Sequence, residues 1–581
     1  MFLNLWKHIR ERRRRQFYLL LILTIMSSFS EMLSLGAIFP FISIIMEPNK
    51  VLTSPILAKI FHWLEIASSL ELIMLLSILF AILVVFSGTL RLLLMWVNIR
   101  LGNAIGTDLG IDIYRKTLYQ PYCVHVARGS NEIISSITQK VNAATTVIVA
   151  VVTFITNVSL FIAIWITLLV IDPIISMVAT AGFGMAYLII ASNTRRRLVQ
   201  NSRVIAQQQT NVLKSLQEGL GAIRDVLLDG VQEVYSNIYN RAAVELQRAN
   251  SENSFISQFP RYFIESLAMV LFAFLVLMMS RRPHGLIHVL PILGVLALGA
   301  QRLLPLMQMI YGNWSVIAGS RAALLDVIEL LNQKLPETAD QPEPLPLIFN
   351  HEIKFHQVSF RYEDSTPWVL DKINLVIPKR ARIGIIGSTG GGKSTTLDLL
   401  MGLLEPTLGQ LQVDGQAIDM SNRRAWQCTI AHVPQSIFLS DSTIAENIAF
   451  GVMPEKIDRQ RVREAAKQAK AHQFIESSLH GYDTFVGERG VRLSGGQRQR
   501  IGIARALYKR ASILCFDEAT SALDNNTEHE VMEAVDGLDA NLTLIIIAHR
   551  LTTLKNCTHI VQLEGGKIKH IGAYSNILEL A

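Results

Sequence analysis

A glycine-rich stretch, GSTGGGKST, lies between the apolar run RIGII and the helix-forming run TTLDLLMGLL. This order of strand, loop and helix is the context that a phosphate-binding P-loop requires. Glycines let backbone N–H groups point at phosphate oxygens, and the helix N-terminus adds positive potential. A glycine turn without function is the weaker alternative in this context. The predicted nucleotide-binding residues are Gly387, Ser388, Thr389, Gly390, Gly391, Gly392, Lys393, Ser394 and Thr395.

Within this loop two side chains have separate predicted roles. Lys393 reaches the β- and γ-phosphates, and the Ser394 hydroxyl coordinates Mg²⁺. A second stretch, ILCFDE, is an apolar strand that ends in Asp517 and Glu518. A solvated strand end is the alternative interpretation, but phosphoryl transfer needs metal-held charge and a positioned water. We therefore expect Asp517 to hold Mg²⁺ and Glu518 to orient and deprotonate the attacking water.

The stretch LSGGQRQRIGIARAL, which begins at Leu493, is the most specific in the chain. Its glycine pair leads into a helix N-terminus and so predicts a second anion site. A single nucleotide-binding domain has no second triphosphate to fill that site. The sequence therefore predicts that a second subunit supplies one.

LSGGQ resembles the signature of the ATP-binding cassette (ABC) family. The resemblance implies ATP and Mg²⁺ as cofactors, and it implies that the signature clamps the γ-phosphate of ATP held by the opposite subunit. The signature residues are Ser494, Gly495, Gly496 and Gln497.

The other motifs of the family follow in its usual order. Tyr362 looks like the aromatic residue that stacks on adenine, and Gln435, in HVPQ, looks like the residue that senses Mg²⁺. SALD, which ends at Asp524, looks like the loop that crosses the dimer interface. His549 looks like the histidine that contacts the γ-phosphate, although a lone histidine after a strand is usually structural. No motif departs from a catalytic pattern.

Composition indicates a membrane protein with more than one domain. The chain has 581 residues, which exceeds the size of one soluble core, and 50% of them are hydrophobic while only 17% are charged. The net charge of +7 could indicate nucleic acid, but no basic recognition motif with interleaved aromatics occurs, so we expect no nucleic-acid partner. Four scattered cysteines fit reduced thiols better than a disulfide framework.

Six apolar runs are long enough to cross a bilayer. An even number of spans puts both ends of the membrane domain on one side, and the basic cluster at Arg12 to Arg15 predicts that this side is cytosolic. We expect a multi-pass protein of the bacterial inner (plasma) membrane, with its N-terminus and nucleotide-binding domain in the cytosol. The predicted spans are residues 17–45, 70–97, 143–171, 174–192, 262–280 and 286–312.

Long polar stretches follow the second and fourth spans and read as helix, so we expect helices that protrude into the cytosol. The predicted fold is a polytopic α-helical membrane domain followed by an α/β P-loop NTPase domain. The boundaries are a transmembrane domain at 1–333, a proline-rich acidic linker at 334–349 and a nucleotide-binding domain at 350–581.

The whole chain resembles the half-size ABC exporters, which include the lipid A flippases. In that family short coupling helices sit at the tips of the long cytosolic helices. The resemblance places the first near Gln120 to His125 and the second after Asp225. Because the chain holds a complete set of motifs, two copies make two competent ATP sites, and a homodimer in the lipid bilayer is expected.

The substrate must be deduced from charged residues in the spans, which are costly in a membrane. Arg91, Arg261 and Arg302 could line a cavity for an anionic head group, which arginine binds bidentately. The alternative is that Arg261 pairs with Glu265 and that the other two reach the interface. Glu31 has no obvious role.

The stretches MSSFSEMLSLGAIFPFISI, FPRYFIESLAM and LGAQRLLPLMQMI are similar to the bacterial flippases for lipid-linked oligosaccharides. The leading interpretation is therefore ATP-driven translocation of a lipid-linked oligosaccharide or polysaccharide precursor. The second is an exporter of drugs, peptides or other lipids of the lipid A type. The third, an ATP-gated channel or regulatory subunit, is disfavoured because gating would tolerate loss of Glu518 and LSGGQ.

Overall fold

The chain folds into two compact units. The computed structural model describes residues 2–37, 69–171, 173–280, 285–518, 525–537, 541–548 and 550–578. The helical unit comprises Met1–Gln120 and Arg128–Leu335, and the mixed unit comprises Pro121–Ala127 and Pro336–Ala581.

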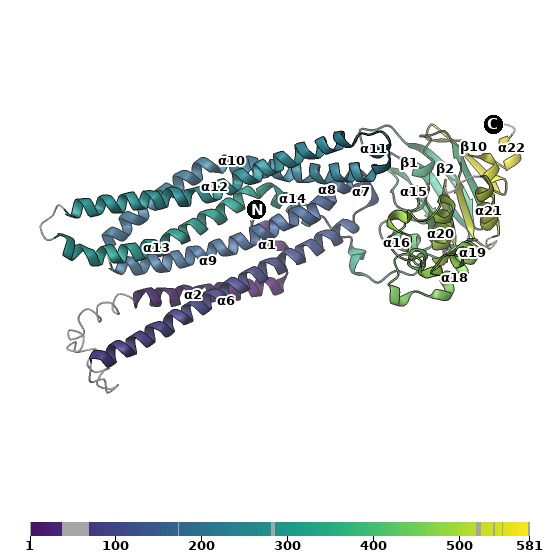
Figure 1. Cartoon of the computed structure of the whole chain (residues 1–581). Coiled ribbons are helices and arrows are strands. Elements are labelled where there is room, and N and C mark those ends of the chain that lie inside the picture. Colours follow the sequence, from purple (N-terminus) through teal and green to yellow (C-terminus); the bar gives the residue numbers. More distant parts are fainter. Residues whose placement is uncertain are drawn as a thin grey trace. The chain divides into compact units, whose positions relative to one another are not determined.

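The helical unit is built from long helices (Figure 1). Three of them have 49 or 50 residues, so at 1.5 Å per residue each is about 75 Å long, more than twice the hydrocarbon thickness of a bilayer. The helices are thus as long as the sequence led us to expect, and their extension into the cytosol stays a prediction. The helices are α1 (Phe2–His8), α2 (Glu11–Gly36), α6 (Ser69–Leu118), α8 (Ser130–Ser135), the π-helix η1 (Ser136–Lys140), α9 (Val141–Ile171), α10 (Pro173–Gly221), α11 (Ile223–Leu228), α12 (Gln232–Ser280), α13 (Gly285–Gly319) and α14 (Arg321–Leu331).

Within the described residues, three stretches are long and apolar enough to cross a membrane. They are Glu11–Ser34, Ser77–Leu118 and Asn131–Val170, and they overlap the first three predicted spans. The other three predicted spans lie in α10, α12 and α13, which contain residues whose side chains the structure does not describe. Those three spans stay predictions.

One apolar core joins α1, α2, α6, α9 and α14. Ile113, Leu324 and Val327 are fully buried there, and Leu5 of α1 is 2% exposed. The short helix α1 is thus packed by its apolar residues against helices far from it in sequence. Burial of this kind, at about 25 cal/mol per Å² of apolar surface outside the lipid, fixes the N-terminus to the bundle.

Helix α14, the last of the helical unit, is held by cations from α6, from the π-helix and from the turn before α8. Lys140 is buried at the end of the π-helix and forms an ion pair of 2.7 Å with Asp326. Arg128 pairs with Glu329 at 2.8 Å, and the Lys116 ammonium donates to the carbonyl oxygen of Leu331. These contacts fix the segment from which the chain continues into the linker.

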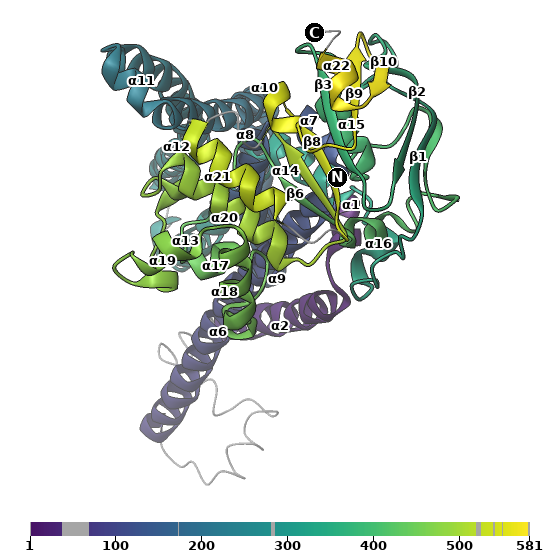
Figure 2. The same cartoon turned by 90° about the vertical axis from the view of Figure 1, so that its right-hand side faces the viewer.

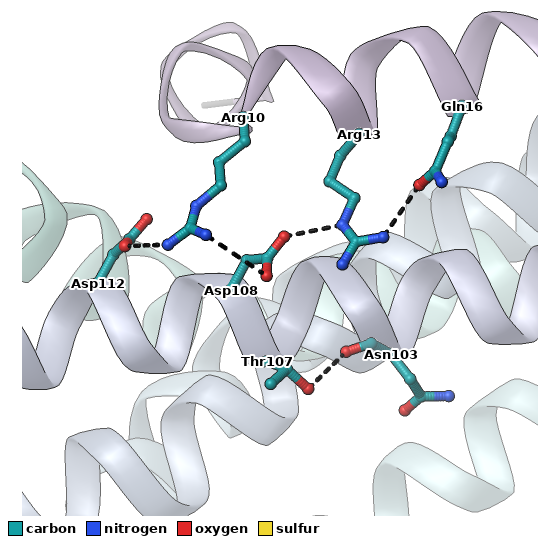
Figure 3. A network of polar contacts seen from close by, with 7 residues as sticks. All are labelled: Arg10, Arg13, Gln16, Asn103, Thr107, Asp108 and Asp112. Carbon is teal, nitrogen blue, oxygen red and sulfur yellow. Dashed lines mark hydrogen bonds and ion pairs between the residues drawn. The ribbon is translucent and has the colours of Figure 1, made fainter.

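A charged network joins the start of α2 to α6 (Figure 3). Asp108 of α6 accepts from Arg13 Nε at 2.8 Å and lies 4.0 Å from Arg10 Nη1. Arg10 also donates to Asp112 at 2.8 Å, and Arg13 donates to Gln16 at 3.0 Å. Asp108 and Arg13 are 16% and 22% exposed, whereas Arg10 is 52% exposed. Asp108 is therefore the residue on which the network depends.

The mixed unit contains two sheets (Figure 2). An antiparallel sheet has the order β2-β1-β4-β5, and a second sheet has the order β10-β9-β3-β8-β7-β6. The strands are β1 (Glu352–Phe360), β2 (Leu370–Pro378), β3 (Arg382–Gly387), β4 (Leu408–Val413), β5 (Gln416–Ala417), β6 (Ile430–Val433), β7 (Ile513–Asp517), β8 (Thr543–Ile547), β9 (His559–Glu564) and β10 (Lys567–Gly572).

In the larger sheet β3, β6, β7, β8 and β9 run parallel, and only β10 is antiparallel. Parallel strands are buried on both faces, which explains the continuous apolar runs RIGII, ILCF and TLIII. The carboxyl ends of β3 and β7 meet at the same edge, with β8 between them. Ligands of open α/β sheets bind at such an edge.

The mixed unit also contains α-helices. They are α7 (Tyr122–Ala127), α15 (Lys393–Leu400), α16 (Arg423–Cys428), α17 (Ile444–Ile448), α18 (Arg459–Gln468), α19 (His472–Glu476), α20 (Gly495–Tyr508), α21 (Asn525–Asp536) and α22 (Tyr574–Leu578). Helix α7 overlaps the predicted first coupling helix, and by its contacts it belongs to the mixed unit. Helix α11 of the helical unit lies where the second was expected.

The Asp108 network generates a stability prediction. Asp108→Asn removes the carboxylate shared by two guanidinium groups, so we expect a loss of ~2 kcal/mol, typical of a hydrogen bond to a charged group. Asp112→Asn is the matched control and should cost less, because its hydrogen-bonding partner Arg10 is half exposed. Thermal unfolding of the two purified variants compares them. Equal midpoints for both variants would contradict the central role of Asp108.

Candidate functional site

The P-loop connects β3 to α15, as the sequence predicts. The Lys393 side chain is 6% exposed and turns back over the loop, where its ammonium donates to the carbonyl oxygens of Gly387 and Ser388 at 3.0 and 3.1 Å. The lysine is therefore held at the centre of the loop. An arriving phosphate would meet a cation already in place.

Two glycines of this loop tolerate no side chain. Gly392 has φ +93°, and a Cβ there would lie 2.5 Å from Cδ2 of Leu370. A Cβ at Gly387 would lie 2.2 Å from the carbonyl oxygen of Leu563. The loop thus lies against β2 and β9 at van der Waals distance, and this close approach explains why the stretch is rich in glycine.

The structure brings Gln435 and Glu518 together. Gln435 Nε2 donates to Glu518 Oε2 at 2.9 Å, although 83 residues separate them in the sequence. Glu518 has φ +47°, a left-handed conformation that residues with a side chain rarely adopt, and its backbone N–H donates to the Ile547 carbonyl at 3.0 Å. Strain of this kind gathers at functional sites, because surrounding contacts must hold it. The backbone thus turns sharply directly after β7, at Glu518, the predicted catalytic base.

Carboxylates crowd this edge of the sheet. Burial raises the pKa of Asp517, and the nearby Glu518 raises it further while Lys393 lowers it. Asp398 of α15 was not singled out from the sequence, yet burial, and then Asp517, raise its pKa to about 6. Its position five residues after Lys393, inside the P-loop helix, is the sequence signal that could have found it. A cation here would relieve repulsion among these groups.

Ser394, Gln435 and Asp517 offer a hydroxyl, an amide oxygen and a carboxylate, the oxygen ligands that Mg²⁺ takes together with phosphate oxygens. This donor set fits the predicted metal. Among the residues that the structure describes, no cluster of three or more His, Cys, Asp or Glu side chains could hold a metal ion by itself. A metal here would therefore depend on the nucleotide for part of its coordination.

The side chain of Tyr362 lies close to the first turn of the P-loop helix α15. Its hydroxyl is 3.5 Å from Oγ1 of Thr395, and its ring packs edge-to-face on Phe360 at 5.0 Å between centroids. The side chain is 50% exposed, so one face of the ring is open. The structure thus brings the predicted adenine-stacking residue next to the predicted phosphate loop.

The signature residues form a helix cap. Ser494 precedes α20, its hydroxyl accepts from the Gln497 N–H at 3.3 Å, and the Gln497 side chain accepts from the Ser494 N–H at 3.0 Å. This capping box fixes the first turn, which contains Gly495 and Gly496. Two other predicted site residues, Asp524 and His549, lie outside the described residues.

The two described arginines of the predicted substrate cavity each contact a carboxylate. Arg261 donates to Glu265 at 3.0 Å, the pairing considered as the alternative. Arg91 Nη1 lies 3.3 Å from Glu31, which is 5% exposed and also accepts from Ser87 at 2.8 Å. Glu31 is therefore the counter-ion of Arg91. The third arginine, Arg302, has a side chain that the structure does not describe.

The raised pKa of Asp398 predicts a pH-dependent stability. Its pKa in the folded protein, about 6, exceeds its ordinary 3.8, so the folded state binds more protons and loses stability as pH rises through this window. Asp398→Asn should therefore stabilise the full chain near neutral pH by ~1 kcal/mol, allowing for solvent screening. This gain should vanish in acid, as followed by thermal unfolding across pH.

Asp414 supplies a control, because its pKa is shifted in the opposite direction to that of Asp398. Burial acts to raise its pKa, but three backbone N–H donors outweigh it, so the pKa is lowered. Asp414→Asn should destabilise the protein near neutral pH. If Asp398→Asn gave the same stability change in acid and at neutral pH, the carboxylate would not be the cause.

Comparisons with known proteins agree with this site. The family model described as ABC transporter matches residues 370–521. The chain is 42% identical over 267 residues to the ATP-dependent lipid A-core flippase of Desulfotalea psychrophila, covering 46% of each chain. It is 39% identical over 273 residues to ABC transporter B family member 22 of Arabidopsis thaliana, covering 47% of this chain and 22% of that one. The chain thus spans less than half the length of these curated relatives.

A solved structure extends the similarity to the fold of the whole chain. A bacterial Atm1-family ABC exporter with ATP bound superposes with a TM-score of 0.78 at 23% identity, covering 98% of this chain and 96% of that one. This likeness confirms the predicted fold class, a helical membrane domain followed by a P-loop nucleotide-binding domain. Residues 370–521 thus match the ABC transporter family, and the whole chain has the fold of an ABC exporter.

Proposed function

We propose that this chain hydrolyses ATP and uses the energy to export an amphiphile across a membrane. The observation that carries the proposal is the hydrogen bond from Gln435 to Glu518 at the sheet edge that holds the P-loop lysine. A carboxylate held in position at the sheet edge that also carries a buried lysine is suited to phosphoryl transfer to water.

In this mechanism each residue of the chain has one task. Lys393 neutralises charge on the β- and γ-phosphates, and Glu518 accepts a proton from the water that attacks the γ-phosphorus as the bond to the β-phosphate oxygen breaks. Gln435 holds the Glu518 carboxylate in position at 2.9 Å. Mg²⁺, when held by Ser394, Gln435 and Asp517, would supply further charge neutralisation. Asp524 and His549 are assigned to the dimer interface and the γ-phosphate by the family resemblance alone.

The proposal requires two copies. The N-terminus of α20, which Ser494 caps, would take one anion, and the P-loop of the same chain would take one triphosphate. In a homodimer, the signature of each copy would face the ATP bound by the P-loop of the other copy, so both sites of each chain would be occupied. Helix α7 would pass the closure to the membrane helices, since Tyr122 in it lies within electrostatic reach of Asp398 and Tyr362.

The cargo is proposed to be an anionic amphiphile moved from the cytosolic to the outer side of the bacterial inner membrane. The curated relatives include lipid A-core flippases, which favour a lipid A-type cargo over the lipid-linked oligosaccharide expected first. Their match concerns the nucleotide-binding half, which moves cargo but does not select it. Arg91 and Arg261 are half-exposed, at 45% and 49%, but each is already paired with a carboxylate, so an anionic head group would have to compete with Glu31 and Glu265 for them.

Loss of the catalytic carboxylate tests the mechanism. Glu518→Gln keeps the size of the side chain but removes the base, so ATP hydrolysis should fall at least about 100-fold while ATP binding is retained. Phosphate release and equilibrium binding of labelled ATP measure the two properties. Hydrolysis near the wild-type rate would show that Glu518 is not the base.

Translocation in proteoliposomes tests the cargo. The full-length protein is supplied with ATP and with lipid A, a polyprenyl-diphosphate oligosaccharide or an uncharged drug, with Glu518→Gln as the inactive control. We expect transport of the anionic lipids, lowered at least about tenfold by the double change Arg261→Ala and Arg302→Ala, with basal hydrolysis little changed. Arg241→Ala with Arg248→Ala, two exposed arginines of α12 outside the predicted span, is the matched control. Unchanged transport in the first double variant would refute the arginine site.

A further inference from the structure

The arginines at the start of α2 divide into two sets. Arg10 and Arg13 pair with Asp112 and Asp108 of α6. Arg14 donates to the carbonyl oxygens of Trp6 and Lys7 at 2.8 and 2.9 Å. All three side chains therefore form hydrogen bonds or ion pairs with other residues of the protein.

Arg12 and Arg15 form the other set. Both side chains are exposed, and no residue that the structure describes forms a hydrogen bond or an ion pair with either. At 100° per residue, Arg12 and Arg15 lie within about 60° of each other and on the side of the helix opposite Arg10 and Arg13. The contacts to α6 therefore turn Arg12 and Arg15 outward, away from the bundle.

The outward side of α2 continues as an apolar stripe. One turn after Arg15, Leu19 is 65% exposed, and similar residues follow at helical spacing along a segment apolar enough to cross a membrane. An exposed apolar stripe on a membrane-spanning helix is suited to lipid chains, and it places the two arginines at the polar end of those chains. The stripe consists of Leu19, Ile22, Met26, Phe29 and Leu33.

An aromatic cluster marks the same level of the helix. Trp6 of α1 packs edge-to-face on Phe17 at 5.0 Å and on Tyr18 at 6.2 Å, and Arg14 lies over the Trp6 ring at 5.9 Å. Tryptophan and tyrosine gather at membrane–water interfaces. The cluster and the arginines together indicate that the head-group region begins within two turns of Arg15.

We propose that Arg12 and Arg15 form a binding site for the phosphate of an anionic phospholipid of the surrounding bilayer. Guanidinium groups bind phosphate oxygens bidentately, and the lipid chains would lie along the stripe that begins at Leu19. The Asp108 network presets the site, because it fixes the rotation of α2 before any lipid arrives. This site concerns the annular lipid and does not depend on the identity of the transported cargo.

Lipid preference of the full-length protein tests the site. Purified protein is reconstituted in phosphatidylcholine with trace spin-labelled phosphatidylglycerol or spin-labelled phosphatidylcholine, and the motionally restricted fraction of each label is measured. The wild type should prefer phosphatidylglycerol. Arg12→Gln with Arg15→Gln should weaken this preference roughly fivefold per arginine, and high salt should weaken it in the wild type.

Two further double variants test whether the effect depends on the positive charge at these two positions. Arg12→Lys with Arg15→Lys retains the charge and should retain most of the preference. Lys456→Gln with Lys467→Gln makes the same change in net charge on exposed residues of the mixed unit and should have no effect. An unchanged preference in Arg12→Gln with Arg15→Gln, or loss of dimers in that variant, would overturn the proposal; the second result would assign this face to a second copy of the chain.

Discussion

Buried charge at the edge where β3 and β7 end is the constraint on which the nucleotide site depends. Lys393 is almost fully buried, and Asp517 and Asp398 beside it have raised pKa values because burial penalises their charged forms. Charges withdrawn from water must be compensated by partners. In the protein alone, loop carbonyls serve the lysine and Gln435 serves Glu518. Phosphate oxygens would compensate the lysine and a divalent cation would compensate the carboxylates, so these charges support the proposed binding of ATP with Mg²⁺.

The same constraint orders the helical unit. Its charged residues are placed in pairs between helices: Arg13 with Asp108, Lys140 with Asp326, and Arg91 with Glu31. Each pair spares a charge from facing an apolar environment alone, and each also fixes the rotation of one helix against another. Arg12 and Arg15, which pair with no residue in the described part of the chain, are turned outward. Pairing thus decides which cations stabilise the fold and which are left for a ligand.

The motifs of the nucleotide site were predictable because their chemistry is local. The P-loop from Gly387 to Thr395 combines a strand, glycines and a helix N-terminus within one short segment, so sequence order alone implies the geometry. The capping box between Ser494 and Gln497 spans only three residues. Helix lengths were also predictable, since long stretches without breakers stay helical. Asp398 was missed because its place in the P-loop helix shows only that it is near the phosphate loop, and its contact with Asp517, more than a hundred residues later, depends on strand order.

The sequence alone thus determined the resemblance to ABC proteins, the phosphate-binding loop and the long apolar helices, because these depend on neighbours in the chain. Only the tertiary structure decided which distant charges meet. Gln435 forms a hydrogen bond with Glu518, and Glu31, for which the sequence suggested no role, pairs with Arg91. One side of α2 faces α6, so Arg13 pairs with Asp108 while Arg12 points away from α6. Such pairings depend on helix rotation and strand order, which follow from the packing of the whole fold and leave no periodic signal in any one segment.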